Sequence, residues 1–355
     1  MIDENINILE LCKKPGQFES VNRVSSEWSR SDYLGSIKCR ISNSFRMKYK
    51  IKPGLYAIGE PDGNSDVFVS ANYKLSFDIL RKALNGLSSW ILVLDTKGIN
   101  VWCAAGKGTF GTEELVKRAK EIKLNGILNH RRIIVPQLGA VGVNADAVFK
   151  QTGFKVYFGP VYAKDIKTYL NAGRRKTPEM RKVKFSMLDR LVLTPREIIP
   201  ALSKFFIFAV IALLFFGIQP TGILFKSAWV CGGPFLLLGL TSVIAGSFIT
   251  PVILPFIPFR SFALKGWIAG ILLAMLVIFS FNLPEQKNFL IFSAEIIFFP
   301  MASSYLALQF TGSATFTNMS GVKKELKIAL PVYLISTVIS IILLVIYKLH
   351  KLAVI

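Results

Sequence analysis

The sequence predicts an α/β unit with a Rossmann-like parallel sheet, followed by an all-α transmembrane bundle of about five spans. The chain is 52% hydrophobic and yet carries a formal net charge of +21. Most of the charge precedes residue 200, and long apolar runs follow it. Before residue 200, strand-like runs alternate with segments of helical apolar spacing. The predicted parts are a basic N-terminal segment (1–50), the α/β unit (51–173), a basic linker (174–200) and a transmembrane domain (201–355).

The N-terminal segment is polar and basic, and we expect it to be poorly ordered or peripheral to the α/β unit. No apolar signal segment follows Met1, so we expect the α/β unit to stay in the cytoplasm. Free thiols rather than disulfides are expected in that compartment.

The α/β unit is predicted from alternating patterns. The expected strands are 54–59, 66–71, 90–95, 132–139 and 154–160. The expected helices are 76–86, ending at Gly86, 111–122, with Thr112 as N-cap, 144–153 and 163–173. Because ligands of such sheets bind beyond the carboxyl ends of the strands, the candidate site segments are Leu94–Lys97, Pro136–Gly142 and Gly159–Val161.

The transmembrane domain is predicted from apolar runs of about 20 residues. The expected spans are 201–219, 228–249, 266–283, 289–310 and 327–347. The apolar stretch 250–259 contains three prolines, which favours an interfacial or re-entrant segment over a sixth span. Glu295 lies within the fourth span, where an acid is either functional or part of the polar packing of the bundle.

The positions of basic residues predict the orientation in the inner (cell) membrane. The run 174–184 should face the cytoplasm and contact lipid headgroups. Lysines at 323 and 324 place the polar loop 311–326 on that same side. If 250–259 crossed the bilayer, the loop would face the opposite side.

Cys103 lies in the least ordinary context of the four cysteines. Gly98 can end the preceding strand, Asn100 can cap a short helix that begins at Val101, and Gly106 can stop it. A thiol in the first turn of a helix faces the positive end of the helix dipole, which favours the nucleophilic, metal-binding thiolate. A buried structural cysteine is an equally good interpretation.

Several other chemistries fit the sequence poorly. A Walker A loop is excluded because Val101 and Gly108 stand where it needs glycine and serine or threonine. The spacing of Gly106, Gly108 and Gly111 is only a weak dinucleotide signal, since the first glycine does not follow the strand directly. The cysteines lack zinc-ligand spacing, and nothing in the spacing supports a pair between Cys103 and His130.

The segment "NVWCAAGK" (100–107) resembles the signature of the mercury-methylating corrinoid membrane proteins, the HgcA family. The resemblance continues through further segments: "PGLYAIG" (53–59), "SANYKLSFD" (70–78), "LDTKGIN" (94–100), "PQLGAVGV" (136–143), "GFKVYFGPVYAKD" (153–165) and "FTGSATFT" (310–317). Val141 departs from the family pattern, where proline is common. The α/β unit is also similar to the corrinoid domain of the corrinoid iron–sulfur protein of acetyl-CoA synthesis.

The resemblance implies that the Cys103 thiolate is the lower axial ligand of cobalt in a base-off cobalamin, and that the chain methylates Hg(II). The sequence lacks the Asp-x-His-x-x-Gly loop that provides a histidine ligand in many corrinoid methyltransferases. A soft thiolate donates electron density strongly to the metal, which favours methyl transfer to an electrophile. Whether the methyl leaves as a carbanion equivalent or as a radical stays open.

The residues expected to bind the cofactor fall into three segments and include small side chains that would let the flat ring approach closely. They are Ser70, Ala71, Asn72 and Tyr73; Asn100, Val101, Trp102, Cys103, Ala104, Ala105, Gly106 and Lys107; and Gln137, Leu138, Gly139, Ala140, Gly142, Gly159 and Pro160.

The chain has too few cysteines to hold an iron–sulfur cluster, so cobalt reduction needs an external donor. The resemblance implies a ferredoxin-type 4Fe–4S partner (HgcB), which also could deliver Hg(II), and a methyl-folate-dependent methyl donor; no nucleic acid is implied. Two alternatives stay open. One is a membrane-anchored corrinoid methyl carrier with another acceptor, and the other is a nucleotide-binding membrane transporter or sensor.

Overall fold

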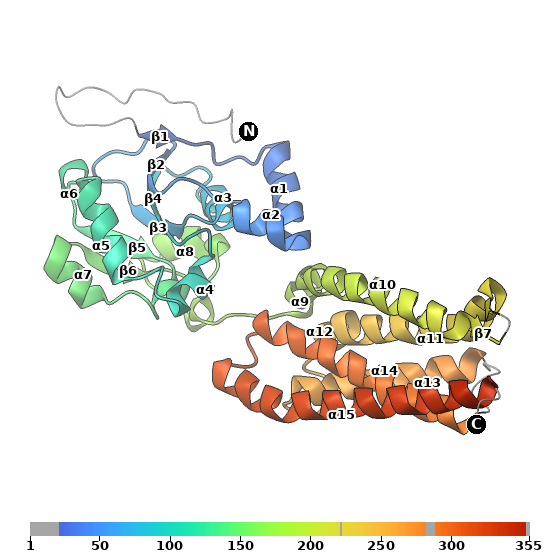
Figure 1. The fold of residues 1–355 in the computed structure, drawn as a ribbon. Helices are drawn as coiled ribbons and strands as arrows, with labels where there is room; N and C mark the ends of the chain where they lie inside the picture. Colours follow the sequence, from blue (N-terminus) through green and yellow to red (C-terminus); the bar gives the residue numbers. More distant parts are fainter. Residues whose placement is uncertain (1–20, 221, 282–287, 353–355) are drawn as a thin grey trace. The chain divides into compact units, whose positions relative to one another are not determined.

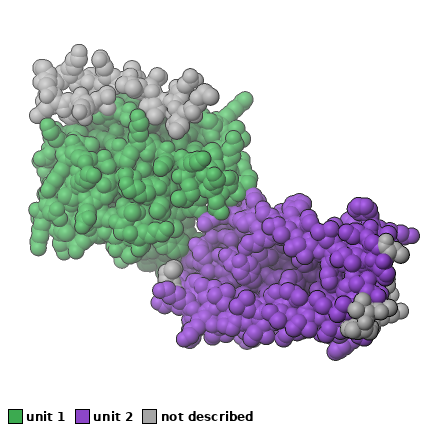
Figure 2. Space-filling model, in the orientation of Figure 1, with its two compact units in different colours: residues 1–184 green, residues 185–355 purple. Residues whose placement is uncertain are grey.

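The computed structural model describes residues 21–220, 222–281 and 288–352 (Figure 1). The chain divides into two compact units, residues 1–184 and residues 185–355 (Figure 2). The predicted class is confirmed, since a mixed six-stranded sheet with helices is followed by a helical unit.

The sheet of the first unit has the strand order β1-β2-β4-β3-β5-β6. Its strands are β1 Asn22–Arg23, β2 Gly54–Ile58, β3 Val67–Ala71, β4 Ser89–Leu94, β5 Arg132–Val135 and β6 Lys155–Phe158. Strands β3 to β6 are parallel to one another, so their carboxyl ends share one edge.

Strand β2 corrects the prediction of a fully parallel sheet. It pairs antiparallel with β4, and β1 pairs parallel with β2. The physical reason lies in the segment 59–66 that joins β2 to β3. A parallel connection needs a crossover of a dozen or more residues, usually a helix, and this segment is too short for one.

Helices cover both faces of the sheet. The helices of this unit are α1 Arg30–Ile41, α2 Asn43–Lys48, α3 Lys74–Ala83, α4 Val101–Gly106, α5 Thr112–Glu121, α6 Leu124–Ile127, α7 Ala145–Thr152 and α8 Ile166–Asn171. One buried cluster joins α4, α5, α6 and α7 to one face, and a second joins α3 and α8 to the other. Alternate side chains of β3 point into the two clusters. Val67 and Val69 belong to the first cluster, and Phe68 belongs to the second.

The N-cap of α5 differs from the prediction. Gly111 is the N-cap and Thr112 is the first helical residue. The Thr112 hydroxyl instead accepts a hydrogen bond from the Asn144 backbone N–H at 2.8 Å. This contact ties the start of α5 to the start of α7.

Residues 21–50 are built into the first unit, which corrects the expectation of a poorly ordered or peripheral segment; residues 1–20 lie outside the described part. Strand β1 extends the sheet. Helix α1 begins with a capping box in which Ser29 and Asp32 bond reciprocally. Cys39 of α1 packs in a cluster with Tyr73 and Leu75.

The second unit contains five helices that are long and apolar enough to cross a membrane, as predicted. Its helices are α9 Met187–Leu193, α10 Pro195–Gly217, α11 Phe225–Ile244, α12 Thr250–Val252, α13 Phe262–Phe281, α14 Phe289–Gln309 and α15 Met319–Lys351, with a π-helical turn at Ala245–Ile249 joining α11 to α12. A small hairpin pairs β7 Ile218–Gln219 with β8 Gly222–Ile223. The final residues of the predicted span 266–283 lie outside the described part.

Two segment predictions change in the second unit. The first residues of 250–259 complete the second long helix, and turns follow, so the described residues there form no further span. The predicted loop 311–326 is helical from Met319 onward. Asn318 caps this helix, because its side chain accepts a hydrogen bond from the Gly321 N–H. This N-cap lies eight residues into the polar segment, and the hydropathy of the segment alone does not reveal it.

Candidate functional site

Cys103 lies in the first turn of α4, at the sheet edge where β3, β4, β5 and β6 end. The Asn100 side chain caps this helix, since its Oδ1 accepts a hydrogen bond from the Cys103 N–H at 2.9 Å. The predicted N-cap is therefore confirmed. The Cys103 thiol is exposed, which contradicts the alternative of a buried structural cysteine.

The end of α4 lies slightly beyond the prediction. The helix includes Gly106, and Lys107 is its C-cap residue. The left-handed backbone conformation that ends the turn belongs to Gly108, at φ +80°. A Cβ added at Gly106 or Gly108 would meet nothing within 4 Å, so the surface around the end of α4 is open.

Asn72, directly after β3, organises the loop that leads to α4. Its Oδ1 accepts hydrogen bonds from the Thr96 N–H at 3.0 Å, the Thr96 hydroxyl at 2.9 Å and the Gly98 N–H at 2.9 Å. Its Nδ2 donates to Asp95 at 3.1 Å. Asn72 is 4% exposed, so it acts on the loop from within the fold.

Asp95 anchors the same loop from the other side. Its backbone N–H donates to Glu114 of α5 at 2.9 Å, and Arg118 pairs with Glu114. Partial burial opposes ionisation of Asp95, but hydrogen bonds from the Lys97 side chain and backbone outweigh it and lower the pKa of Asp95. The backbone of Lys97 adopts the left-handed conformation, at φ +60°.

The small residues of α4 face the core. Ala104 is fully buried and Ala105 is 5% exposed, and both belong to the cluster beneath the sheet face. A Cβ at Gly142 would lie 3.2 Å from the Ala105 Cα and would collide with the Phe110 carbonyl. The small side chains thus let α4 and the 137–142 turn pack together. In the structure Ala104 and Ala105 therefore serve the packing of α4, whereas the sequence predicted that their small side chains would let a flat ring approach closely.

Trp102 and Val141 point the other way. Trp102 is 44% exposed and Val141 is 82% exposed. Trp102 therefore does not anchor α4 in the core. Both residues belong to segments that the packing of Gly142 on Ala105 brings together.

The segments after β5 and β6 meet at this edge as predicted from the topology. The Gly159 N–H donates to the Val135 carbonyl at 2.8 Å, and the Gln137 N–H donates to the Pro160 carbonyl at 3.5 Å. The Gln137 side chain accepts a hydrogen bond from Lys176. Leu138 and Ala140 are half-buried in the same turn, whereas Gly139, Gly159 and Pro160 are buried.

The predicted segment Ser70–Tyr73 ends β3 at the same edge, but its side chains are buried. Tyr73 packs against Cys39 of α1 and Leu75. Ser70, Ala71 and Tyr73 are thus part of the interior of the unit rather than of an open surface.

His130 lies away from Cys103. It lies two residues before the first residue of β5, so it stands at the amino end of that strand, opposite the edge where Cys103 lies. Its Nε2 bonds the Ser65 carbonyl, and its Nδ1 accepts the Arg132 N–H. The structure therefore does not form a pair between Cys103 and His130.

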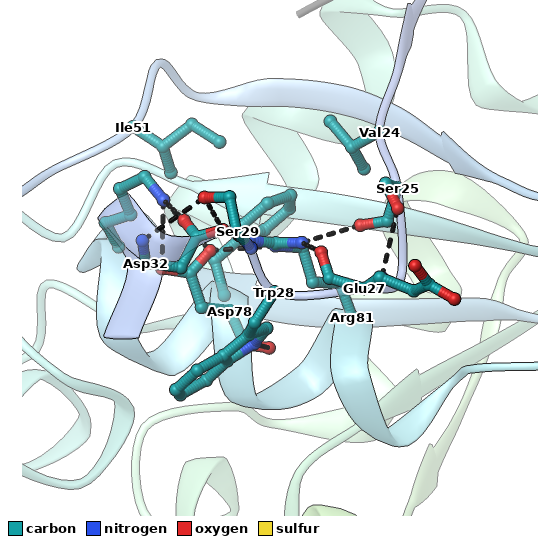
Figure 3. Close-up of a pocket in the computed structure, with 11 residues that line it drawn as sticks. Val24, Ser25, Glu27, Trp28, Ser29, Asp32, Ile51, Asp78 and Arg81 are labelled. Atoms are coloured by element: carbon teal, nitrogen blue, oxygen red, sulfur yellow. Dashed lines mark hydrogen bonds and ion pairs between the residues drawn. The ribbon is translucent and has the colours of Figure 1, made fainter. Parts of the chain in front are cut away.

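A second polar cluster lies between α1 and α3, around a cavity of about 340 Å³ (Figure 3). Lys74 bridges Asp32 and Asp78 at 2.7 and 2.9 Å, and Arg81 bridges the same two carboxylates at 2.7 and 2.8 Å. Arg81 also donates to the carbonyls of Ser25 and Glu27. The two cations and two anions balance, so the cluster clamps residues 25–32 onto α3.

This clamp was not predicted from the sequence. Within α3 the spacings of Lys74 to Asp78 and of Asp78 to Arg81 are those of helical ion pairs and could have indicated part of it. Burial opposes ionisation of Asp32, but hydrogen bonds from Lys74, Ser29 and Arg81 outweigh it and hold the pKa of Asp32 far below its ordinary value.

Comparison with known proteins relates the first unit to corrinoid proteins. Residues 39–170 match the family model of the CO dehydrogenase/acetyl-CoA synthase delta subunit. The gamma subunits of the acetyl-CoA decarbonylase/synthase complexes of Archaeoglobus fulgidus and Methanopyrus kandleri are 30% and 31% identical to this chain over 137 and 145 residues. These matches cover 38% and 40% of this chain and 29% and 31% of the relatives.

The corrinoid/iron–sulfur protein large subunit of Moorella thermoacetica is 30% identical over 125 residues, which are 35% of this chain and 28% of that protein. The chain thus spans less than a third of the length of these three relatives. Their names do not mention mercury. The matched segment contains the whole edge around Cys103, and residues 39–170 are related to a domain of the corrinoid proteins of acetyl-CoA synthesis.

Proposed function

We propose that residues 39–170 bind a corrinoid, with the Cys103 sulfur as the lower axial ligand of cobalt, and that the chain methylates Hg(II). The observation that carries the proposal is the exposed Cys103 thiol at the edge of a sheet that is related to corrinoid proteins. The octapeptide 100–107 supports the mercury chemistry.

The residues around Cys103 fit such a cofactor. The thiol is exposed, and open surface follows it at Gly106 and Gly108. A thiolate is a soft ligand suited to a late transition metal. Trp102 and Lys107 of the Cys103 segment are exposed, as is Val141 of the turn that packs on α4, so they are the side chains that would contact a flat macrocycle. When bound, the corrinoid supplies the cobalt chemistry of methyl transfer.

The other residues of the edge would hold Cys103 in place. Asn100 fixes the first turn of α4 by capping it. Asn72 and Asp95 fix the loop before that cap, and Ala105 and Gly142 seat α4 on the neighbouring turn. A ligand held on several hydrogen-bonded elements needs little reorganisation when it binds metal.

The proposal requires partners. Within residues 21–220, 222–281 and 288–352 no group of three His, Cys, Asp or Glu side chains could hold a metal ion. The proposal includes an external ferredoxin-type 4Fe–4S protein as electron donor and a methyl-folate-dependent methyl donor, the partners that the resemblance of residues 100–107 implies. Hg(II) is the substrate.

A second candidate is a membrane-anchored corrinoid methyl carrier with another acceptor. The observation that favours it is that the named relatives are subunits of acetyl-CoA decarbonylase/synthase complexes. The two candidates share the cofactor and differ in the final acceptor.

The test uses the full chain reconstituted with methylcobalamin and supplied with Hg(II), and compares Cys103→Ala with Cys231→Ser, which alters a thiol in the other unit. We expect Cys103→Ala to lose cobalt–sulfur coordination, measured by X-ray absorption at the cobalt edge, and to form no methylmercury. The fold should be retained because the Cys103 side chain is exposed. An unchanged cobalt spectrum in Cys103→Ala would show the ligand assignment to be wrong. Wild-type cobalt–sulfur coordination without methylmercury formation would favour the methyl carrier.

A further inference from the structure

Helix α1 packs with its polar side inward. Its buried residues are Asp32, Gly35, Ser36 and Cys39. Its large apolar residues point outward: Tyr33, Leu34, Ile37 and Ile41 are between 43% and 56% exposed. Leu34, Ile37 and Ile41 have the spacing of one helical face. These apolar side chains thus lie on the solvent side of α1, where a helix of a water-soluble domain ordinarily places polar residues.

The reversal is held in place by the clamp beneath the helix. Asp32 lies 2.7 Å from both Lys74 and Arg81, and the Gly35 position closely approaches the Tyr49 ring. Turning the apolar face inward would break these ion pairs and separate buried charges, which is strongly unfavourable. The apolar stripe formed by Leu34, Ile37 and Ile41 therefore stays on the outside of the unit. Met47 of α2 is also exposed, at 58%, and extends it.

Positive charge surrounds the stripe. Arg30, Lys38 and Lys48 are exposed, and Arg40 and Arg46 are partly exposed. Asp32 is the one acid in residues 30–48 and lies buried in the clamp. An aromatic pair at the edge of the stripe, Trp28 and Tyr33, has ring centroids 5.1 Å apart, and Lys82 lies over both rings.

We propose that this α1–α2 face, formed by Leu34, Ile37, Ile41 and Met47 with the cations at 30, 38 and 48, binds the surface of an anionic lipid bilayer. Apolar side chains flanked by lysine and arginine on one helical surface are the pattern of interfacial membrane binding. Tryptophan and tyrosine favour the same depth. A bilayer is also close by, because the chain carries five membrane-length helices, which raises the effective concentration of lipid around the first unit.

The face borders the candidate site. A Cβ at Gly98, in the loop that leads to α4, would lie 3.5 Å from the Met47 carbonyl oxygen. Lipid binding by α1 and α2 would therefore hold the edge that carries Cys103 near the membrane surface. The proposal needs neither cofactor nor mercury chemistry, so its failure is distinct from failure of the proposed function.

The experiment places the photoreactive residue benzoylphenylalanine at Ile37 in the full chain, in phosphatidylcholine nanodiscs with or without phosphatidylglycerol. The matched control places it at Phe149 of α7, which is 56% exposed on another surface of the same unit. After illumination, mass spectrometry identifies the adducts. We expect at least about tenfold more lipid adduct from position 37 than from position 149 in discs with phosphatidylglycerol.

A charge variant sharpens the test. Arg30→Gln, Lys38→Gln and Lys48→Gln together should reduce lipid adduct at position 37 to the level at position 149. The control variant Lys120→Gln, Lys150→Gln and Lys167→Gln removes the same charge from exposed positions on other helices and should leave the adduct unchanged.

Adducts from position 37 to residues 1–20, to a second copy or to a co-purified protein in place of lipid would overturn the proposal. Equal lipid adduct at positions 37 and 149, or no dependence on phosphatidylglycerol, would also overturn it.

Discussion

Asn72→Ala should loosen the loop that presents Cys103 without touching α4 itself. The change removes one acceptor that serves the Thr96 N–H, the Gly98 N–H and the Thr96 hydroxyl. The hydroxyl can still donate to the Ile99 carbonyl at 2.6 Å, so two buried N–H groups lose their partner. Each unsatisfied group costs about 1–3 kcal/mol, and partial relaxation of the loop brings the expected sum to about 2–4 kcal/mol.

Amide hydrogen exchange resolved over residues 94–100 measures this local free energy directly. The expected loss corresponds to roughly 30- to 700-fold faster exchange of the loop amides. Amides of β5, which share no hydrogen bond with Asn72, provide the internal control. Unchanged exchange of the Thr96 and Gly98 amides would refute the role assigned to Asn72.

Asn72→Asp separates the acceptor from the donor role of the side chain. It keeps an oxygen for the two N–H groups but places a carboxylate where Nδ2 now lies 3.1 Å from Asp95. Like charges at that separation raise the pKa of one carboxyl in the folded state. The loss of loop stability in Asn72→Asp should therefore increase as pH rises. It should decrease as pH falls into the range where the two carboxyl groups share a proton.

Two further changes test the packing around the site. Ala105→Leu should destabilise the first unit by about 1–3 kcal/mol or more, because the side chain is buried against Gly142. The control is Gly106→Ala, whose added methyl group meets open space. Thermal unfolding measures both variants, and equal midpoints would contradict the buried position of Ala105. Burial raises the pKa of Tyr49 to about 12, with Lys74 opposing and Asp78 assisting. A raised pKa in the folded state favours the neutral phenol, so Tyr49 should stabilise the fold below pH 10 and lose this contribution between about pH 10 and 12. Tyr49→Phe should abolish that part of the loss of stability at alkaline pH. If the free energy of unfolding depends on pH in the same way in the variant and the wild type, the role assigned to Tyr49 is wrong.

Local signals predicted the short helix that carries Cys103. The Asn100 cap and the start of α4 depend on residues within a few positions of one another, and the structure confirms them. The meeting of the segments after β4, β5 and β6 follows from parallel topology alone. These features need no knowledge of distant contacts.

Features that depend on distant partners were not predictable in the same way. Strand β2 pairs with β4, more than thirty residues further along the chain, and the sequence does not show which strand it will join. Small residues such as Ala104 and Ala105 fit both clearance for a ligand and close packing on Phe110 and Gly142, and only the fold decides between the two.

Helix α1 was missed for a related reason. Apolar periodicity indicates which side of a helix is buried only when apolar residues form that side. In α1 the buried side is polar because Asp32 meets Lys74 and Arg81 from α3, more than forty positions along the chain. The spacing of apolar residues within α1 carries no information about that contact.

Hydrogen bonds inside the second unit predict which segments share one side of the membrane. At one end, the Ser313 hydroxyl donates to Glu197 of α10 at 3.0 Å, and Arg190 donates to the Val252 carbonyl at 3.0 Å. At the other end, Lys348 donates to the Phe216 carbonyl at 3.4 Å.

The segment around Ser313 should therefore lie on the same side as the start of α10, where the first unit joins, and the end of α15 should lie opposite. Single cysteines in a chain whose native cysteines are replaced by serine test this. Gly312→Cys has open space for its side chain, and Phe225→Cys occupies a position that is 90% exposed at the other end. With a cytoplasmic first unit, an impermeant maleimide should label Phe225→Cys in intact cells and Gly312→Cys only after the membrane is opened. Labelling of Gly312→Cys in intact cells would reverse the predicted orientation, and labelling of both from one side would be incompatible with a first long helix that crosses the bilayer.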